Sequence, residues 1–96
     1  METTELEIRR RRALFRAIHR GTKEMDWLLG RFAKAKLADM NASELGTFEQ
    51  LLSISDPDLN DWILDPMLIE NREFGPLVTA LRAFHGLEEL TDKAAS

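Results

Sequence analysis

The stretch ALFRAIHRGTKEMDWLLGRF, residues 13–32, contains the pattern that decides the fold: two apolar stripes on either side of one glycine. Within each stripe, apolar residues recur at intervals of three and four, which is the spacing of one face of an α-helix. Gly21 predicts the end of the first helix, because glycine reaches the left-handed conformation that helix C-termini often need. Thr22 predicts the start of the second, because its hydroxyl can accept a hydrogen bond from the first turn. We therefore expect one helix over about 5–19 and another running to about residue 37.

A third helix is predicted after residue 40. Asn41 and Ser43 are alternative caps for it, and Glu44 follows Asn41 at the spacing of a capping box, in which cap and glutamate each bond the other's backbone N–H.

Two proline-containing turns predict two more helices. Asp56 and Pro57 open a short one, with the aspartate as cap and the proline at the first helical position, and it stops before Pro66. The segment Gly75-Pro76 opens the last helix in the same way, and Gly86 can end it. The positions expected to face inward along the chain are Leu6, Ala13, Leu14, Ala17, Ile18, Met25, Leu28, Leu29, Phe32, Leu45, Phe48, Leu52, Leu59, Trp62, Ile63, Leu77, Leu81 and Phe84.

These elements predict an all-α fold: a compact antiparallel bundle of four or five short helices. No long alternating run of β-branched residues predicts a strand. The 96 residues suit a single domain over 1–96, with frayed ends at about 1–5 and 88–96.

The composition narrows the class of protein. The chain has no cysteine, which excludes disulfides, thiolate metal sites and a cysteine nucleophile. No apolar run approaches the roughly 20 residues that cross a bilayer. The start METTE is acidic and unlike a signal or transit peptide. We expect a cytoplasmic protein without membrane association, or a mitochondrial matrix protein if a presequence has been removed.

Charge is unevenly distributed along the chain. Residues 1–36 contain ten Lys or Arg against five Asp or Glu, whereas residues 37–96 contain three against twelve. A basic end and an acidic end suggest a polarised surface that orients a partner.

The sequence offers little for catalysis or metal binding. His19 and His85 lie far apart without neighbouring ligands, whereas a metal site needs three or four that converge. Glu24 and Asp26 are two residues apart on a helix and point away from each other, so they make a poor acid–base pair. We expect no catalytic residue, no metal and no enzymatic activity.

The corner between the first two helices is the best candidate for partner binding. Arg20 offers a planar fork of donors, Gly21 allows another backbone to approach, and Glu24 lies in the first turn of the second helix. The three can form one polar contact patch. The alternative is purely structural: a glycine at a helix end, a glutamate that complements the helix dipole, and a solvated arginine.

The arginine run 9–12, followed by Arg16 and Arg20, is a second candidate. Arg9, Arg12 and Arg16 can align on one helix face as a basic stripe that meets phosphates or an acidic partner. An arginine-rich nucleic-acid-binding or antitoxin-like regulatory protein is therefore an alternative function, although the chain is acidic overall and has no recognisable nucleic-acid-binding motif. A solvated basic face is the plainer explanation.

Two motifs together resemble a known family. Arg20-Gly21-x-x-Glu24 is similar to the Arg-Gly-x-x-Glu signature of the succinate dehydrogenase assembly factors, also called FAD assembly factors. Asp56-Pro57-Asp58-Leu59-x-x-Trp62 looks like the second motif of the same family. The resemblance extends over about residues 10–85.

The resemblance implies a five-helix, non-catalytic assembly factor. It implies binding to the flavoprotein subunit of succinate dehydrogenase, and in some members of fumarate reductase, so that FAD becomes covalently attached to a flavoprotein histidine. FAD would be the cofactor of the client, with none stably bound here, and we expect a monomer. By residue match, Arg20, Gly21 and Glu24 would contact the flavoprotein with Arg12 in the same patch. Asp56 and Trp62 would shape its border, although core packing is the better reading of Trp62.

Overall fold

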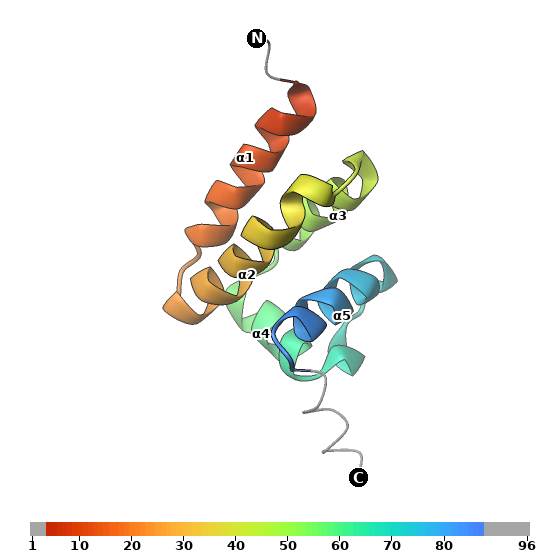
Figure 1. The fold of residues 1–96 in the computed structure, drawn as a ribbon. Coiled ribbons are helices and arrows are strands. Elements are labelled where there is room, and N and C mark those ends of the chain that lie inside the picture. Colours follow the sequence, from red (N-terminus) through yellow and green to blue (C-terminus); the bar gives the residue numbers. More distant parts are fainter. Residues whose placement is uncertain (1–3, 88–96) are drawn as a thin grey trace.

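The computed structural model describes residues 4–87, which form five α-helices and three single-turn 3-10 helices (Figure 1). The α-helices are α1 (Glu5–Ile18), α2 (Lys23–Lys36), α3 (Ala42–Leu51), α4 (Asp56–Leu64) and α5 (Gly75–Phe84). The 3-10 helices are Leu37–Asp39, Pro66–Leu68 and Arg72–Phe74. Residues 4–87 contain no strand, and the prediction of an all-α fold with four or five helices is confirmed.

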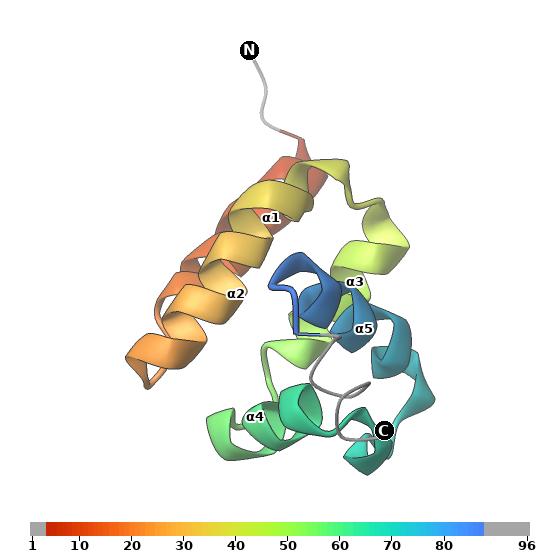
Figure 2. The ribbon, with the colours of Figure 1, turned by 60° about the horizontal axis from the view of Figure 1, so that its bottom comes forward.

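The first two helices form an antiparallel hairpin (Figure 1). α3 packs against α1, while α5 contacts both α2 and α4. In the second view, α4 runs from the tip of the hairpin toward α5 (Figure 2), and its first residue, Asp56, bonds the α1–α2 corner. The hairpin is tight because Gly30 faces Ile18: a Cβ atom at residue 30 would lie 2.8 Å from Ile18 Cγ2. Glycine therefore permits an approach of α1 and α2 that any larger residue would disturb.

One hydrophobic core joins the five helices. The buried apolar residues are Ala13, Ala17, Met25, Leu29, Phe32, Ala33, Leu37, Met40, Leu45, Phe48, Leu51, Leu52, Leu59, Ile63, Phe74, Val78 and Leu81. Most inward-facing predictions are therefore confirmed, but α5 differs. Val78 is fully buried and was not predicted, whereas Phe84 is 39% exposed. Phe84 lies in the last turn of α5, where its ring contacts Phe32 and His85 but stays partly exposed.

Three predicted helix signals are confirmed. Thr22 Oγ1 accepts a hydrogen bond from the Met25 backbone N–H at 3.2 Å. Asn41, rather than Ser43, caps α3 in a reciprocal capping box with Glu44. Gly86 has φ +69° directly after the C-cap of α5, the left-handed conformation expected of it.

Two other helix-end predictions were wrong. Ser55, not Asp56, caps α4, because the Asp56 carboxylate bonds the α1–α2 corner instead. Gly21 does not supply a left-handed helix end, since Gly86 alone has a positive φ among the described residues. The chain leaves α1 through His19, and a carboxylate from α2 binds the freed backbone N–H of Arg20.

The predicted frayed ends lie mostly outside the described residues. Thr4 and Glu5 are the exceptions, because Thr4 caps α1 and Glu5 is its first residue. Within the described part of the chain, no helix has the length and apolar character needed to span a membrane.

Candidate partner-binding site

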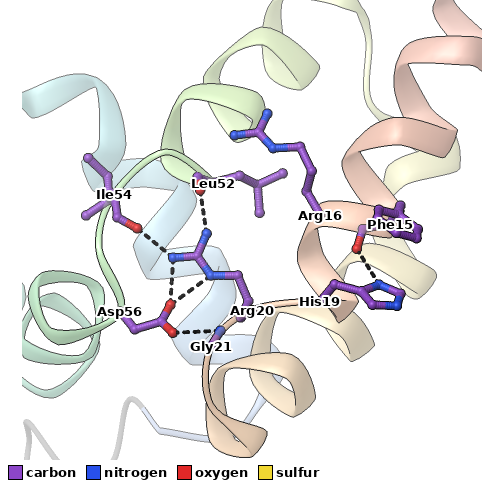
Figure 3. A pocket seen from close by; sticks show the side chains of 8 residues that line it. All are labelled: Phe15, Arg16, His19, Arg20, Gly21, Leu52, Ile54 and Asp56. Carbon is purple, nitrogen blue, oxygen red and sulfur yellow. Dashed lines mark hydrogen bonds and ion pairs between the residues drawn. The ribbon is translucent and has the colours of Figure 1, made fainter.

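The two sequence motifs meet at one ion pair. Arg20, at the end of the α1–α2 hairpin, reaches the α3–α4 junction, where its Nε atom donates to Asp56 Oδ1 at 2.8 Å and its Nη2 lies 2.7 Å from the same oxygen. The Arg20 side chain is only 9% exposed and that of Asp56 18%. Its terminal nitrogens also donate to the backbone carbonyls of Leu52 and Ile54 (Figure 3). Every guanidinium nitrogen therefore has an acceptor inside the protein.

Asp56 also holds Gly21. Its second oxygen, Oδ2, accepts a hydrogen bond from the Gly21 backbone N–H at 3.0 Å (Figure 3). A Cβ atom at residue 21 would lie 3.1 Å from this oxygen. A side chain at residue 21 would crowd the Asp56 carboxylate. Glycine is therefore needed here because it lets the backbone approach Asp56 closely. We call the contacts among Arg20, Gly21 and Asp56 the corner lock.

A second carboxylate supports the corner from α2. Asp26 accepts a hydrogen bond from the backbone N–H of Arg20. This role of Asp26 was not predicted from the sequence, where its carboxylate was considered only as a partner of Glu24 in catalysis. The signal was its place one turn after a threonine cap, where a carboxylate can turn back toward backbone donors.

The outer side of the corner is open to solvent. Gly21 and Glu24 are exposed. Two shallow hollows flank the corner, and Asp56 lines both. The first is also lined by Phe15, Arg16, His19, Arg20, Gly21, Leu52 and Ile54 (Figure 3), and the second by Thr22, Glu24, Met25, Pro57 and Asn60. The corner lock thus forms the floor of a surface on which Gly21 and Glu24 are accessible.

Arg12 and Trp62 lie away from this floor. Arg12 is exposed on α1, eight residues before Arg20, or about 12 Å along the helix axis. Trp62 is half-buried on α4, where its ring lies 5.7 Å from that of Phe74. The core reading of Trp62 therefore agrees with its packing. A role for Arg12 or Trp62 in partner binding stays a prediction.

Much of the basic stripe on α1 is used internally. Arg9 forms an ion pair with Glu49 of α3, with Arg9 Nη2 2.6 Å from Glu49 Oε1. The hydrogen bond within this pair is the main reason that the pKa of Arg9 is raised. Arg10 donates to the Met40 carbonyl at 2.7 Å. Arg16 donates to the side chain of Ser53 at 3.2 Å. These contacts join α1 to the segment around α3 and engage Arg9 and Arg16 of the stripe, whereas Arg12 is exposed.

The histidines stay separate. His19 donates to the Phe15 carbonyl at 2.9 Å, and His85 donates to the Leu28 carbonyl at 2.8 Å. Within residues 4–87, no group of three or more His, Asp or Glu side chains is placed to hold a metal ion.

The corner lies in a stretch of the chain that matches a known protein family. Residues 11–85 match the model of a family described as the flavinator of succinate dehydrogenase. The chain belongs to this family. The matched residues include both motif segments and all of the corner lock.

Individual proteins similar to this chain are also named as assembly factors of FAD or of succinate dehydrogenase. The chain is 41% identical over 73 residues to the FAD assembly factor SdhE of Acetobacter pasteurianus, covering 76% of this chain and 67% of that protein. It is 36% identical over 63 residues to SdhE of Coxiella burnetii, covering 66% and 77%. It is 38% identical over 63 residues to the mitochondrial succinate dehydrogenase assembly factor 2 of Dictyostelium discoideum, covering 66% of this chain but 45% of that longer protein. No solved structure gives a significant match.

Proposed function

We propose that this protein is an assembly factor that binds the flavoprotein subunit of succinate dehydrogenase and promotes covalent attachment of FAD to it. The family assignment supports an assembly role in flavinylation. The observation that carries the proposal is the corner lock, because it brings two motif segments, 36 residues apart at Arg20 and Asp56, to one exposed corner. A partner would meet both motifs as a single rigid surface.

The proposal divides the site residues into two roles. Gly21, Glu24 and Arg12 are accessible and would touch the client. Arg20 and Asp56 would act chiefly as positioning residues, since Arg20 is nearly enclosed and its donors are bound within the protein. Trp62 would support the α4 border through its packing against Phe74.

The proposed mechanism is preorganisation of the client. The factor would bind one arrangement of the flavoprotein's domains better than others and shift its population by that difference in affinity. The selected arrangement would hold the acceptor histidine against the flavin, so that the attachment reaction loses less entropy at the transition state. The bond-forming chemistry would belong to FAD and the flavoprotein, and this chain would contribute no catalytic group.

The remaining features of the proposal concern cofactor, assembly and compartment. The chain would hold no FAD of its own, would act as a monomer, and could serve the fumarate reductase flavoprotein as a second client. Its relatives come from bacteria and from mitochondria, which is consistent with action in the cytoplasm or in the matrix.

The nucleic-acid-binding alternative is not favoured. The family match points elsewhere, and Arg9, Arg10, Arg16 and Arg20 all bond partners within the protein. A mobility-shift titration at low salt should show no meaningful binding, whereas a nucleic-acid-binding protein would bind and lose affinity steeply as salt rises.

The direct test joins binding to product formation. The purified flavoprotein subunit is incubated with FAD, with and without this protein, and covalent flavin is read by in-gel fluorescence while a pull-down measures the complex. Wild-type protein should be captured and should raise the covalent flavin signal. Gly21→Arg should abolish both effects, because it fills the open corner and crowds Asp56.

Gly75→Arg is the matched control. It makes the same exchange at the start of α5, where a Cβ atom would meet nothing within 4 Å and the backbone is helical. It should bind and promote flavinylation as wild type does, with a small loss of stability because a Cβ atom before Pro76 disfavours the helical conformation. Full flavinylation with a folded Gly21→Arg protein, its fold verified by circular dichroism, would contradict the proposed contact surface.

A further inference from the structure

Beyond the corner, α2 and the end of α5 together form an aromatic surface. Trp27 is 52% exposed, and its ring lies 4.8 Å from the ring of His85. Phe84 is 39% exposed, and its ring is T-shaped to that of His85 with the centroids 5.0 Å apart. We call Trp27, Leu28, Phe84 and His85 the α2–α5 patch. The Trp27 ring contacts that of His85, which in turn contacts Phe84, so the three rings form one contiguous and partly exposed aromatic surface, the kind of patch that marks interaction sites.

The patch is built to hold the indole in place. His85 is fixed by its hydrogen bond to the Leu28 carbonyl at 2.8 Å. The guanidinium of Arg31 lies 5.2 Å from the Trp27 ring centroid, within cation–π range. With neighbours on two sides, Trp27 loses little conformational freedom on binding, which is the property of an interface anchor.

The α2–α5 patch continues directly from the corner. Lys23, Glu24, Trp27 and Leu28 line one shallow hollow on α2, so Glu24 belongs both to the motif surface and to the edge of the patch. A partner that contacts Glu24 would therefore lie beside this hollow.

Charge identifies the kind of segment that fits. Lys23, Arg31 and Lys34 are exposed along the same helix and outnumber Glu24, its one exposed carboxylate residue. Their positive charge would attract carboxylates and steer an acidic segment to the aromatic rings.

We propose that the α2–α5 patch is a second part of the client interface, with Trp27 as its anchor, and that it receives a flavoprotein segment carrying an apolar side chain flanked by carboxylates. This inference rests on the proposed function and extends the contact surface from the corner to α5.

The test compares affinities for the purified flavoprotein subunit by calorimetry. Trp27→Ala should weaken binding by about tenfold or more, as expected for a central tryptophan. Met67→Ala is the matched control, because Met67 is 91% exposed in a turn after α4 and outside the patch. It should bind within about twofold of wild type, since isolated exposed apolar residues contribute little.

Lys23→Glu tests the charge of the partner segment. Lys23 is the first residue of α2, where negative charge is favoured by the helix dipole, so the variant should be no less stable than wild type. Its affinity should nevertheless fall severalfold, and the loss should shrink at high salt.

Fluorotryptophan labelling locates the contact. The chain has two tryptophans, and Trp62→Phe assigns the two fluorine resonances. Addition of unlabelled flavoprotein should shift the Trp27 resonance by more than that of Trp62, which is half-buried at the border of the proposed surface.

The outcomes separate the two proposals. If wild type does not bind the flavoprotein, the proposed function fails. If wild type binds and Trp27→Ala binds equally well, or if Met67→Ala loses as much, the proposed function stands and the patch inference is overturned. A Trp27 resonance that shifts with the concentration of this chain alone would assign the patch to contact between two copies, which also overturns it.

Discussion

Removing the Asp56 carboxylate tests the corner lock most directly. In Asp56→Ala, Arg20 loses its only ion-pair partner among the described contacts, and the Gly21 N–H loses its acceptor. Arg20 keeps the carbonyls of Leu52 and Ile54, so its charge remains held at a nearly enclosed site without a counter-ion. The variant should therefore destabilise the fold while leaving all five helices intact at low temperature.

The size of the effect follows from burial. A hydrogen bond to a charged group contributes about 1.5–3 kcal/mol. Removing one partner of a fully buried ion pair costs about 3–5 kcal/mol. Because the Arg20 and Asp56 side chains keep 9% and 18% exposure, solvent screens part of this interaction. Allowing for the two remaining carbonyls, we expect a loss of about 3 kcal/mol in the free energy of unfolding.

Urea denaturation monitored by circular dichroism measures this loss. With a denaturant slope of about 1.5 kcal/mol per molar, a loss of about 3 kcal/mol lowers the midpoint by about 2 M. The slope itself should not change, because the folded core is the same. A double-mutant cycle with Arg20→Ala should give a coupling energy of at least about 1 kcal/mol between the two residues.

Asp58→Ala is the matched control, with the same exchange one half-turn later on α4. Asp58 is exposed in the first turn, and its carboxylate contributes chiefly through the helix dipole, about 0.3–1 kcal/mol. An Asp56→Ala protein that loses no more stability than Asp58→Ala would refute the corner lock as a stabilising contact.

Three further substitutions test the fold by the same urea denaturation. Gly30→Ala should destabilise the protein by about 1 kcal/mol, because its methyl group would clash with Ile18. In an Ile18→Ala background the same change should stabilise the protein by up to about 1 kcal/mol. A loss of stability in both backgrounds would contradict the packing argument. Asn41→Ala should cost about 1 kcal/mol by removing the acceptor for the Glu44 N–H, and an unchanged midpoint would show that the capping box is dispensable. Gly86→Ala should cost about 1 kcal/mol because its left-handed φ of +69° disfavours a Cβ atom, and a rise in stability would contradict that assignment.

Local signals predicted most of the helical framework. Thr22 and Asn41 bond donors three residues away, and Gly86 acts on its own backbone. Interactions of such short range are present in the order of residues itself, so they can be read without knowing the fold. The same local reasoning failed at Asp56, where Ser55 caps the helix because a residue distant in sequence uses the carboxylate.

The motif pairing was visible in the sequence only as a resemblance. The order Arg20-Gly21-x-x-Glu24 and then Asp56-Pro57 suggested a family, and the family comparison confirmed it. Nothing in the spacing showed that Arg20 points inward to Asp56, because an arginine at a helix end can equally well extend into solvent or pair with a carboxylate inside the protein.

By itself, then, the order of residues determined the five α-helices, the caps Thr22 and Asn41, most of the apolar faces and the position of the corner, since all depend on contacts within about one helical turn. Tertiary structure alone decided which arginines were enclosed, which aspartate became a counter-ion, and that Trp27, Phe84 and His85 share one surface. Those choices join residues separated by about 30 to 60 positions, and only the packing of all five α-helices around one core brings them into contact.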